Sequence, residues 1–266
     1  MRDTTCDLHT HSTVSDGTCA PAELVRRAHR LGVSALSLTD HDAIGGLAEA
    51  EAEARALGID FLRGVEISAE AEGVDVHILG YGFDPQDPAL LAELARIRRR
   101  REERIPRMVA RLRDLGIELG SRDVLRSAGG GSIGRPHVAR ALVALGVCRS
   151  VDDAFDRFLR AGAPGFVPKR VPTAAEAIAR IRAAGGIAVL AHPLYASRNR
   201  PGGLEALVAA LARHGLGGIE THYVSHRPRD RRRVERVARL GQPIHESDAL
   251  HLLRAPRLAG ERELHG

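Results

Sequence analysis

The chain has 266 residues, of which 44% are hydrophobic and 27% charged, a composition that supports a buried core and argues against global disorder. Its formal net charge of +5 favours anionic partners such as phosphate esters, nucleotides or nucleic acid. No apolar run reaches the ~18 residues of a membrane span. The three cysteines show no paired spacing and the N-terminus shows no signal pattern, and both observations favour a cytoplasmic location.

Strands and helices alternate over roughly the first 90 residues. We expect strands at 6–9, 35–38, 61–65 and 76–81, and helices at 21–31 and 46–57. The first helix begins with Pro21 and is followed by Gly32, which are favoured residues for a helix start and a helix end. This alternation predicts a mostly parallel sheet or barrel.

The middle of the chain has a helical character. The expected helices lie at 88–115, 121–127, 136–145 and 151–159. The first of them is long, highly charged and interrupted near Pro106, and residues 129–134 form a glycine-rich turn. The middle therefore differs from the alternating pattern on either side of it.

The alternation resumes after this helical stretch. Further helices are expected at 174–184, 204–214 and 229–240, and further strands at 187–190, 218–221 and 243–245. We therefore expect one barrel domain formed by 1–99 and 166–266, with 100–165 as a small helical insertion.

Histidines and carboxylates lie close to the ends of the expected strands. His9 and His11 project toward one side, because side chains alternate along a strand, and Asp16 follows five residues later. Two imidazoles and a carboxylate that converge in this way are what a divalent metal needs. The same theme recurs at His41, Glu66, His77, His192 and Asp248.

These polar residues share a position in the expected barrel. Most lie at or just beyond the carboxyl end of a strand, and His77, near the start of its strand, is the exception. In parallel barrels the loops after the strands share one face, where catalytic groups collect. The sequence thus predicts a site for several metals, and its imidazole and carboxylate donors suit Mn²⁺, Fe²⁺ or Zn²⁺ better than Ca²⁺.

Three further residues are candidates for binding a substrate phosphate. Arg135 offers a bidentate fork and Lys169 a point charge, and His226 could donate to a phosphate oxygen or to the leaving oxygen. A surface charge or a helix cap is the alternative interpretation of each. The arginine runs at 98–101 and 229–233 are interpreted as solvated helix faces, with backbone contacts to an RNA 5′ end as the alternative.

The ordered set of motifs resembles a known family. The set is His9-x-His11 with Asp16, Thr39-Asp40-His41, Glu66, His77, Ala191-His192-Pro193 and Ser247-Asp248. It resembles the PHP family, the polymerase and histidinol phosphatase superfamily of metal-dependent phosphoesterases.

A narrower resemblance rests on further motifs. They are Gly64-Val65-Glu66-Ile67-Ser68, His77-Ile78-Leu79-Gly80, Ile133-Gly134-Arg135-Pro136-His137, Val167-Pro168-Lys169 and Ser225-His226. They are similar to the branch that includes nucleoside 3′,5′-bisphosphate phosphatase and a 5′-to-3′ exoribonuclease.

The resemblance implies an α/β fold, a distorted seven-stranded β/α (TIM-like) barrel with a small helical insertion, and two or three divalent metals, of which Mn²⁺ is expected first. The implied ligands of one metal are His9, His11, Glu66 and Asp248. Glu66 would bridge to a second metal held by His77 and His192.

The resemblance also implies a third metal, held by Asp16 and His41. The family completes this third site with a histidine two residues after the aspartate, where this chain has Leu250, and His251 is the candidate substitute.

The implied function is hydrolysis of a phosphate monoester by a metal-bound hydroxide. The expected substrates are AMP, a nucleoside 3′,5′-bisphosphate or the 5′ end of short RNA, with no stable protein partner. One alternative is a degenerate PHP domain, disabled at Leu250, that binds nucleotides or acts as a scaffold. Others are a histidinol-phosphate-type phosphatase, and an amidohydrolase, whose barrel also opens with His-x-His but places a carboxylated lysine between its metals.

Overall fold

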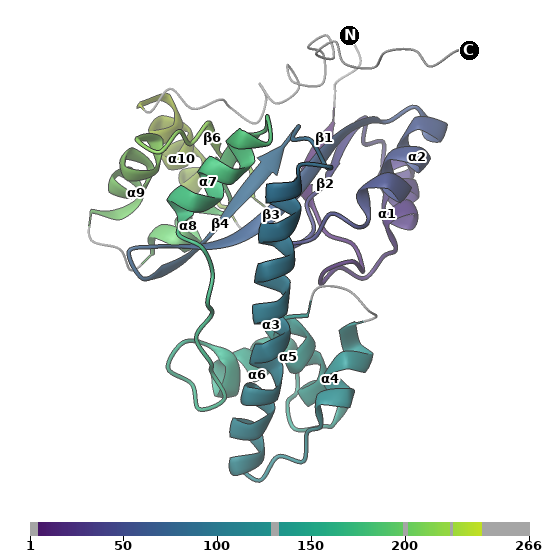
Figure 1. Cartoon of the computed structure of the whole chain (residues 1–266), viewed down its shortest axis with the longest axis vertical. Helices are drawn as coiled ribbons and strands as arrows, with labels where there is room; N and C mark the ends of the chain where they lie inside the picture. The colour runs from purple at the N-terminus through teal and green to yellow at the C-terminus, as the bar shows by residue number, and fades with distance from the viewer. Residues whose placement is uncertain (1–4, 129–132, 199–201, 224–225, 241–266) are drawn as a thin grey trace.

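The computed structural model describes residues 5–128, 133–198, 202–223 and 226–240 (Figure 1). The expected strand at 243–245 and the candidate ligands Asp248 and His251 lie outside the described residues, as does most of the glycine-rich turn at 129–134.

The described residues form a mixed α/β structure around a six-stranded half-barrel sheet. The strands, in spatial and sequence order, are β1 (Cys6–Thr10), β2 (Ala35–Leu38), β3 (Asp60–Ala71), β4 (Val74–Tyr81), β5 (Ile187–Leu190) and β6 (Gly218–Ile219). This arrangement agrees with the TIM-like fold class that the sequence predicts. The seventh strand and a closed barrel stay predictions.

The sheet is mostly parallel, as expected, with one strand that runs against the others. The β1–β2, β2–β3 and β5–β6 pairs are parallel, whereas β4 is antiparallel to both β3 and β5. Only Glu72 and Gly73 join β3 to β4, and both have positive φ angles, 51° and 78°. A two-residue turn of this kind produces a hairpin, because its twist matches that of paired antiparallel strands.

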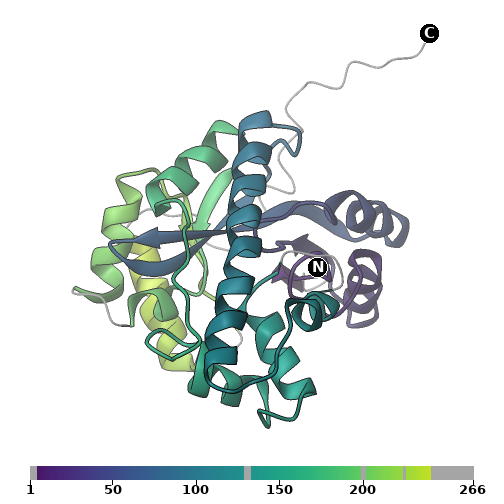
Figure 2. The ribbon, with the colours of Figure 1, turned by 60° about the horizontal axis from the view of Figure 1, so that its bottom comes forward.

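Helices cover the sheet on both sides of the long helix α3 (Figures 1 and 2). Those packed near β1 and β2 are α1 (Pro21–Arg30) and α2 (Leu47–Leu57). Those packed near β5 and β6 are α7 (Ala174–Ala183), α8 (Pro193–Ser197), α9 (Gly203–Ala212) and α10 (Pro228–Leu240). Their apolar faces join the strands in one core around buried Val65, Ile67 and Ile78. The short helix α8 was not expected from the sequence.

Helix α3 (Pro88–Asp114) passes through Pro106 without a break, so the expected interruption is wrong. A proline inside a helix costs about 3 kcal/mol. Ile97, Ile105 and Met108 are nevertheless buried on either side of it. Each such side chain contributes about 1.5–3 kcal/mol, so packing outweighs the cost of the proline.

The C-terminal half of α3 leads into a helical group with its own apolar cluster. The group, as we use the term, comprises residues 100–165, with α4 (Ser121–Ala128), α5 (Arg135–Ala144), α6 (Val151–Ala154) and a π-helical turn, η1 (Phe155–Leu159). Met108, Leu112, Val138 and Leu142 are buried in this cluster. The division into two domains stays a prediction, and α3 crosses residue 100 as one helix.

Among the described residues, no helix combines the length and apolar character that crossing a membrane requires.

Candidate metal centre

The carboxylate of Glu66 lies at the centre of a cluster of five histidines. Glu66 is on β3 and only 1% exposed. Its Oε1 lies 2.8 Å from His77 Nδ1 and 3.0 Å from His192 Nε2. Its Oε2 lies 3.3, 3.2 and 3.1 Å from nitrogens of His9, His11 and His41, respectively. One buried carboxylate thus gathers five of the candidate ligands.

The strand order explains why distant histidines meet here. His9 is on β1, His192 directly follows β5 and Ala191, and His41 forms a parallel bridge with Glu66. His77 lies near the start of β4 and pairs with Ser68. Because β4 is antiparallel, its start lies at the same sheet edge as the carboxyl ends of the parallel strands. We call this edge, with its histidines and Glu66, the strand edge.

Asp16 lies beside the same cluster. Its two carboxylate oxygens are 3.6 Å from His11 Nδ1 and 3.7 Å from His41 Nε2. Three overlapping groups therefore have donor atoms within 4.8 Å of one another: His9, His11 and Glu66; His11, Asp16 and His41; and His41, Glu66 and His77. The overlap is what adjacent metals with shared ligands require.

Two buried atoms at the centre test whether this donor set fits a metal. Glu66 Oε2 and His41 Nδ1 make no hydrogen bond within the described part of the chain, although they lie 3.1 Å apart. An unsatisfied buried polar atom costs about 1–3 kcal/mol. A divalent cation satisfies carboxylate oxygen and imidazole nitrogen together. The residues present therefore fit a divalent metal of the kind that accepts mixed nitrogen and oxygen ligands.

Burial and charge set the protonation of these groups. Burial lowers the pKa of His77 to about 4 and that of His41 well below its ordinary value, which favours the neutral imidazole that metals bind. Burial raises the pKa of Glu66, but the surrounding imidazoles hold it well below its usual range, so Glu66 is a carboxylate.

Glu220 supports the strand edge from behind, and the sequence analysis missed it. It is 3% exposed, accepts a hydrogen bond from His9 Nδ1 (2.9 Å) and accepts another from the backbone N–H of His192 (2.5 Å). Burial lowers the pKa of His9, but the hydrogen bond to Glu220 and the nearby Glu66 carboxylate outweigh burial and raise that pKa to about 10. Glu220 directly follows β6, so it has the same kind of position, just after a strand, by which His192 was identified from the sequence.

Asp40 holds the loop that carries His11 and Asp16. Its carboxylate accepts hydrogen bonds from the Ser12 backbone N–H (2.8 Å), the Ser12 hydroxyl (2.6 Å) and the Ser15 hydroxyl (2.6 Å). The loop is tight, since a Cβ on Gly17 would lie 2.2 Å from the His11 carbonyl oxygen. The Asp40 contacts therefore set the positions of two candidate ligands.

Helix α3 and helix α5 also reach this loop region. Arg101 Nε lies 2.6 Å from buried Asp42 Oδ2, and its Nη2 donates to the Ser68 hydroxyl (2.6 Å). Arg140 donates from both terminal nitrogens to the Asp16 carbonyl oxygen (3.2 and 3.3 Å). Arginines from helices outside the sheet thus brace the segments next to His41 and Asp16.

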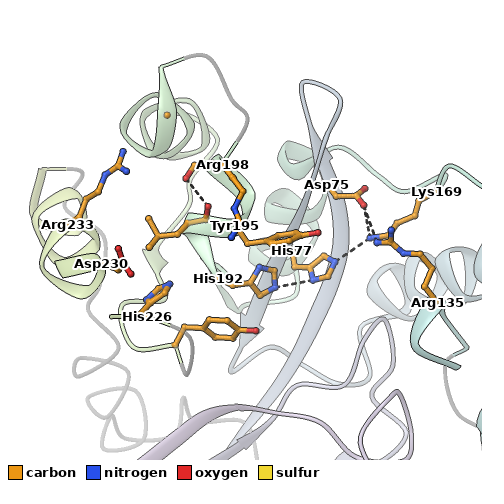
Figure 3. Close-up of a pocket in the computed structure, with 14 residues that line it drawn as sticks. Asp75, His77, Arg135, Lys169, His192, Tyr195, Arg198, His226, Asp230 and Arg233 are labelled. Carbon is orange, nitrogen blue, oxygen red and sulfur yellow. Dashed lines mark hydrogen bonds and ion pairs between the residues drawn. The ribbon is translucent and has the colours of Figure 1, made fainter. Parts of the chain in front are cut away.

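A cavity of about 780 Å³ opens beside His77 and His192 (Figure 3). Arg135 and Lys169 line one flank together with Asp75, whose Oδ2 lies 3.3 Å from Lys169 Nζ and 3.7 Å from Arg135 Nη2. Lys169 Nζ also lies 3.4 Å from His77 Nε2. Burial lowers the pKa of Lys169 to about 8. The flank carries two cations against one carboxylate and so favours an anion.

His226 lines the other side of the cavity and is nearly buried. Its Nδ1 lies 3.3 Å from the Thr221 carbonyl oxygen, which can only accept a hydrogen bond. With Nδ1 donating, the neutral ring leaves Nε2 as an acceptor. The predicted donor role toward phosphate therefore requires a protonated ring, whereas the neutral ring suits a substrate hydroxyl.

The half-barrel and its strand edge define a metal-dependent hydrolase, and comparison with known proteins identifies the family. The PHP domain profile matches residues 7–118. A 3′,5′-nucleoside bisphosphate phosphatase from Chromobacterium violaceum is 41% identical over 221 residues, covering 83% of this chain and 77% of the relative. A 5′-3′ exoribonuclease from Haemophilus influenzae is 43% identical over 188 residues, covering 71% of this chain and 68% of the relative.

A solved structure from Bifidobacterium adolescentis, described as a metal-dependent phosphoesterase, superposes with a TM-score of 0.83 at 33% identity. The match covers 91% of this chain and 86% of that one. The chain belongs to the PHP family of metal-dependent phosphoesterases. It is therefore a hydrolase, and the resemblance that the sequence indicated is confirmed.

Proposed function

We propose that the chain hydrolyses a phosphate monoester of a nucleotide, either AMP or a nucleoside 3′,5′-bisphosphate, or acts on the 5′ end of short RNA. The observation that carries the proposal is the Glu66 carboxylate, within 3.3 Å of five imidazoles and beside a cationic cavity. Relatives at 41% and 43% identity are named for these two kinds of substrate.

The proposed ligand assignment is the one that the family resemblance implies, and its first group matches a donor group in the structure. His9, His11 and Glu66 would hold one metal, His77 and His192 a second shared with Glu66, and Asp16 and His41 a third. Divalent metals bound there, Mn²⁺ first and Fe²⁺ or Zn²⁺ as alternatives, lower the pKa of water and neutralise phosphate oxygens. We also propose Asp248 as a ligand of the first metal and His251 as a ligand of the third, and both lie outside the described residues.

The chain's own residues would bind and orient the phosphate. Arg135 and Lys169 hold its oxygens, and His226 contacts the ester side of the substrate. Water then supplies the new oxygen on phosphorus, the bond to the ester oxygen breaks, and that oxygen leaves as an alcohol with a proton. For a monoester the products are an alcohol and inorganic phosphate. For cleavage of the first phosphodiester at the 5′ end of RNA they are a nucleoside 5′-phosphate and the shortened RNA.

The sheet order supports closure of the barrel by a seventh strand. β1 and β6 are the two outer strands of the described sheet. A strand at 243–245 placed between them would close the barrel and bring Asp248 to the strand edge.

We also propose that residues 100–165 form a separate helical domain inserted into the barrel and that the protein is located in the cytoplasm.

The experiment measures phosphate release from adenosine 3′,5′-bisphosphate, AMP and a short 5′-phosphorylated RNA. The protein is stripped with a chelator and then given Mn²⁺, Fe²⁺ or Zn²⁺. We expect metal-restored release with one substrate ahead. His192→Ala should abolish it, whereas His29→Ala, an exposed histidine on α1, should not.

Two outcomes would redirect the proposal. Metal binding and nucleotide binding without release of phosphate would favour a degenerate binding domain. Release from histidinol phosphate ahead of every nucleotide would favour that phosphatase instead. A carboxylated lysine is disfavoured by the geometry, because Glu66 contacts all five histidines, whereas Lys169 contacts one of them, His77, and is paired with Asp75.

A further inference from the structure

Two aromatic rings line the cavity on the side away from Arg135 and Lys169. The chain has three tyrosines and no tryptophan. Tyr81 is buried, and its hydroxyl donates to the Leu8 carbonyl oxygen (2.8 Å). The other two, Tyr195 and Tyr223, line the cavity. Two of the three tyrosines therefore lie at the site.

Tyr195 presents an uncovered ring beside the strand edge. It lies in the first turn of α8, where its backbone N–H donates to the His192 carbonyl oxygen (2.9 Å). This turn places its ring 5.9 Å from the His192 ring, edge to face at 84°. The side chain is nevertheless 61% exposed. Its ring face is therefore available to stack on a flat group bound in the cavity.

Tyr223 lies deeper in the same cavity. Its ring is 5.7 Å from the His192 ring, 6.4 Å from the His9 ring and 5.6 Å from the His226 ring. Both tyrosines thus approach the same imidazole, His192. A group attached to a phosphate at this imidazole would lie directly against their rings.

The cavity therefore has two chemically different flanks. Figure 3 shows Arg135, Lys169 and Asp75 together beyond His77, with Tyr195 beside His192. Arg198 and Arg233 also line the cavity on the tyrosine side, where Arg233 is paired with Glu205 (3.1 Å). A phosphate is drawn to Arg135 and Lys169, which leaves the rest of the substrate for the tyrosines. Tyrosine faces recognise flat π-systems by stacking and tolerate every base, because each base has a π-face.

We propose that Tyr195 and Tyr223 form a nucleobase-stacking subsite that accepts purine and pyrimidine bases alike. This inference rests on the proposed function, since it places the scissile phosphate at the strand edge. It adds that the base contributes to recognition through its ring face. Recognition of base edges by hydrogen bonds is not part of it.

The test compares substrates that differ only in the base. Phosphate release is measured from AMP, UMP and ribose 5-phosphate, and selectivity is the kcat/KM for each nucleotide divided by that for ribose 5-phosphate. Stacking on one aromatic side chain is worth about 1–3 kcal/mol, so Tyr195→Ser should lower this selectivity by roughly 5- to 100-fold. The loss should lie in KM rather than in kcat.

Two further variants separate stacking from a structural role. Tyr195→Phe keeps the ring and should keep the wild-type selectivity. Leu31→Ser removes a 73% exposed apolar side chain from a site away from the cavity and serves as the matched control. AMP and UMP should fall together in Tyr195→Ser.

The outcomes are distinguishable from failure of the proposed function. If the wild-type protein acts on none of these three substrates, nor on adenosine 3′,5′-bisphosphate or 5′-phosphorylated RNA, the proposed function fails and the subsite fails with it. If it acts on all three and Tyr195→Ser leaves selectivity unchanged, or weakens ribose 5-phosphate equally, the stacking subsite is refuted while the phosphoesterase stands. A loss confined to AMP would overturn the claim that the subsite is blind to base identity.

Discussion

The strand edge and the helical group meet at one site but contribute to it differently. The strand edge supplies imidazoles and Glu66, with donor atoms 2.8–3.3 Å apart. The helical group supplies arginines, namely Arg101, Arg135 and Arg140, which reach the site through long side chains. The strand edge provides ligands, whereas the helical group provides Arg101 and Arg140, which brace neighbouring loops, and Arg135, which lines the cavity.

This difference follows from what each task requires. Metal ligands must be held within about 0.5 Å, which favours positions on strands whose backbones are fixed by their neighbours. A cation acts on a phosphate through a field that falls slowly with distance inside a protein. Flexible side chains from a neighbouring helical group are therefore adequate for charge but not for coordination.

The largest effect should come from removing the charge at the centre of the strand edge. Glu66→Gln should lower kcat/KM by more than 100-fold, because outer-shell partners of a metal alone cost roughly 10–100-fold. Bound metal, measured by elemental analysis, should fall with it. The exposed Glu102→Gln on α3 is the control. Full activity in Glu66→Gln would exclude Glu66 as the bridging ligand.

The second prediction concerns the contact where the two regions join. Asp42 is fully buried, and Arg101→Met would leave its charge unpaired. The free energy of unfolding should fall by about 3 kcal/mol, the lower end of the cost of breaking a buried pair. Denaturant unfolding measures it. Adding Asp42→Asn should restore part of the loss, and a fully additive double variant would contradict the coupling.

The third prediction tests the support behind the strand edge. Glu220→Gln keeps the shape of the side chain but weakens its bonds to His9 and the His192 backbone. Metal affinity should fall roughly 10–100-fold, as for other partners of ligating histidines. Titration calorimetry with Mn²⁺ measures it. Wild-type affinity would show that His9 needs no orienting carboxylate.

The smallest effect should come from a cation of the helical group. Arg135→Lys keeps the charge but loses the planar fork, which costs about 1.5 kcal/mol or roughly 10-fold in KM. Metal affinity should not change, because Arg135 contacts Asp75 and not the strand edge. A change in metal content instead of KM would erase the distinction between the two regions.

The fold was predictable where local patterns decide it. β1, β2 and β5 lie close to where alternation placed them, and α1 starts at its proline. The direction of β4 was not predictable from apolar pattern, because an antiparallel strand shows the same pattern as a parallel one. The two-residue turn at Glu72 and Gly73 decides it, and it lacks the Asn-Gly or Asp-Gly signal typical of hairpins.

The reversal of β4 also explains why His77 belongs to the site although it lies near the start of its strand and not at the end. His77 lies near the start of its strand, and if that strand were parallel to its neighbours, His77 would lie at the opposite end of the strands from Glu66. In the antiparallel strand the same position meets Glu66. The sequence identified His77 as a candidate ligand by its residue type and its place in the order of motifs. Its position beside Glu66 depends on the antiparallel direction of β4.

By itself, the amino-acid sequence determined the types and order of the site residues and the strands on which or beside which they lie. These depend on short-range spacing, which strand and helix geometry translate directly into position. Only the tertiary structure decided that Glu220 and Arg101 belong to the same site. Glu220 follows a strand, as other site residues do, but its partner His9 lies 211 residues away, and Asp42 lies 59 residues from Arg101. Packing, and not a local pattern, selects such partners.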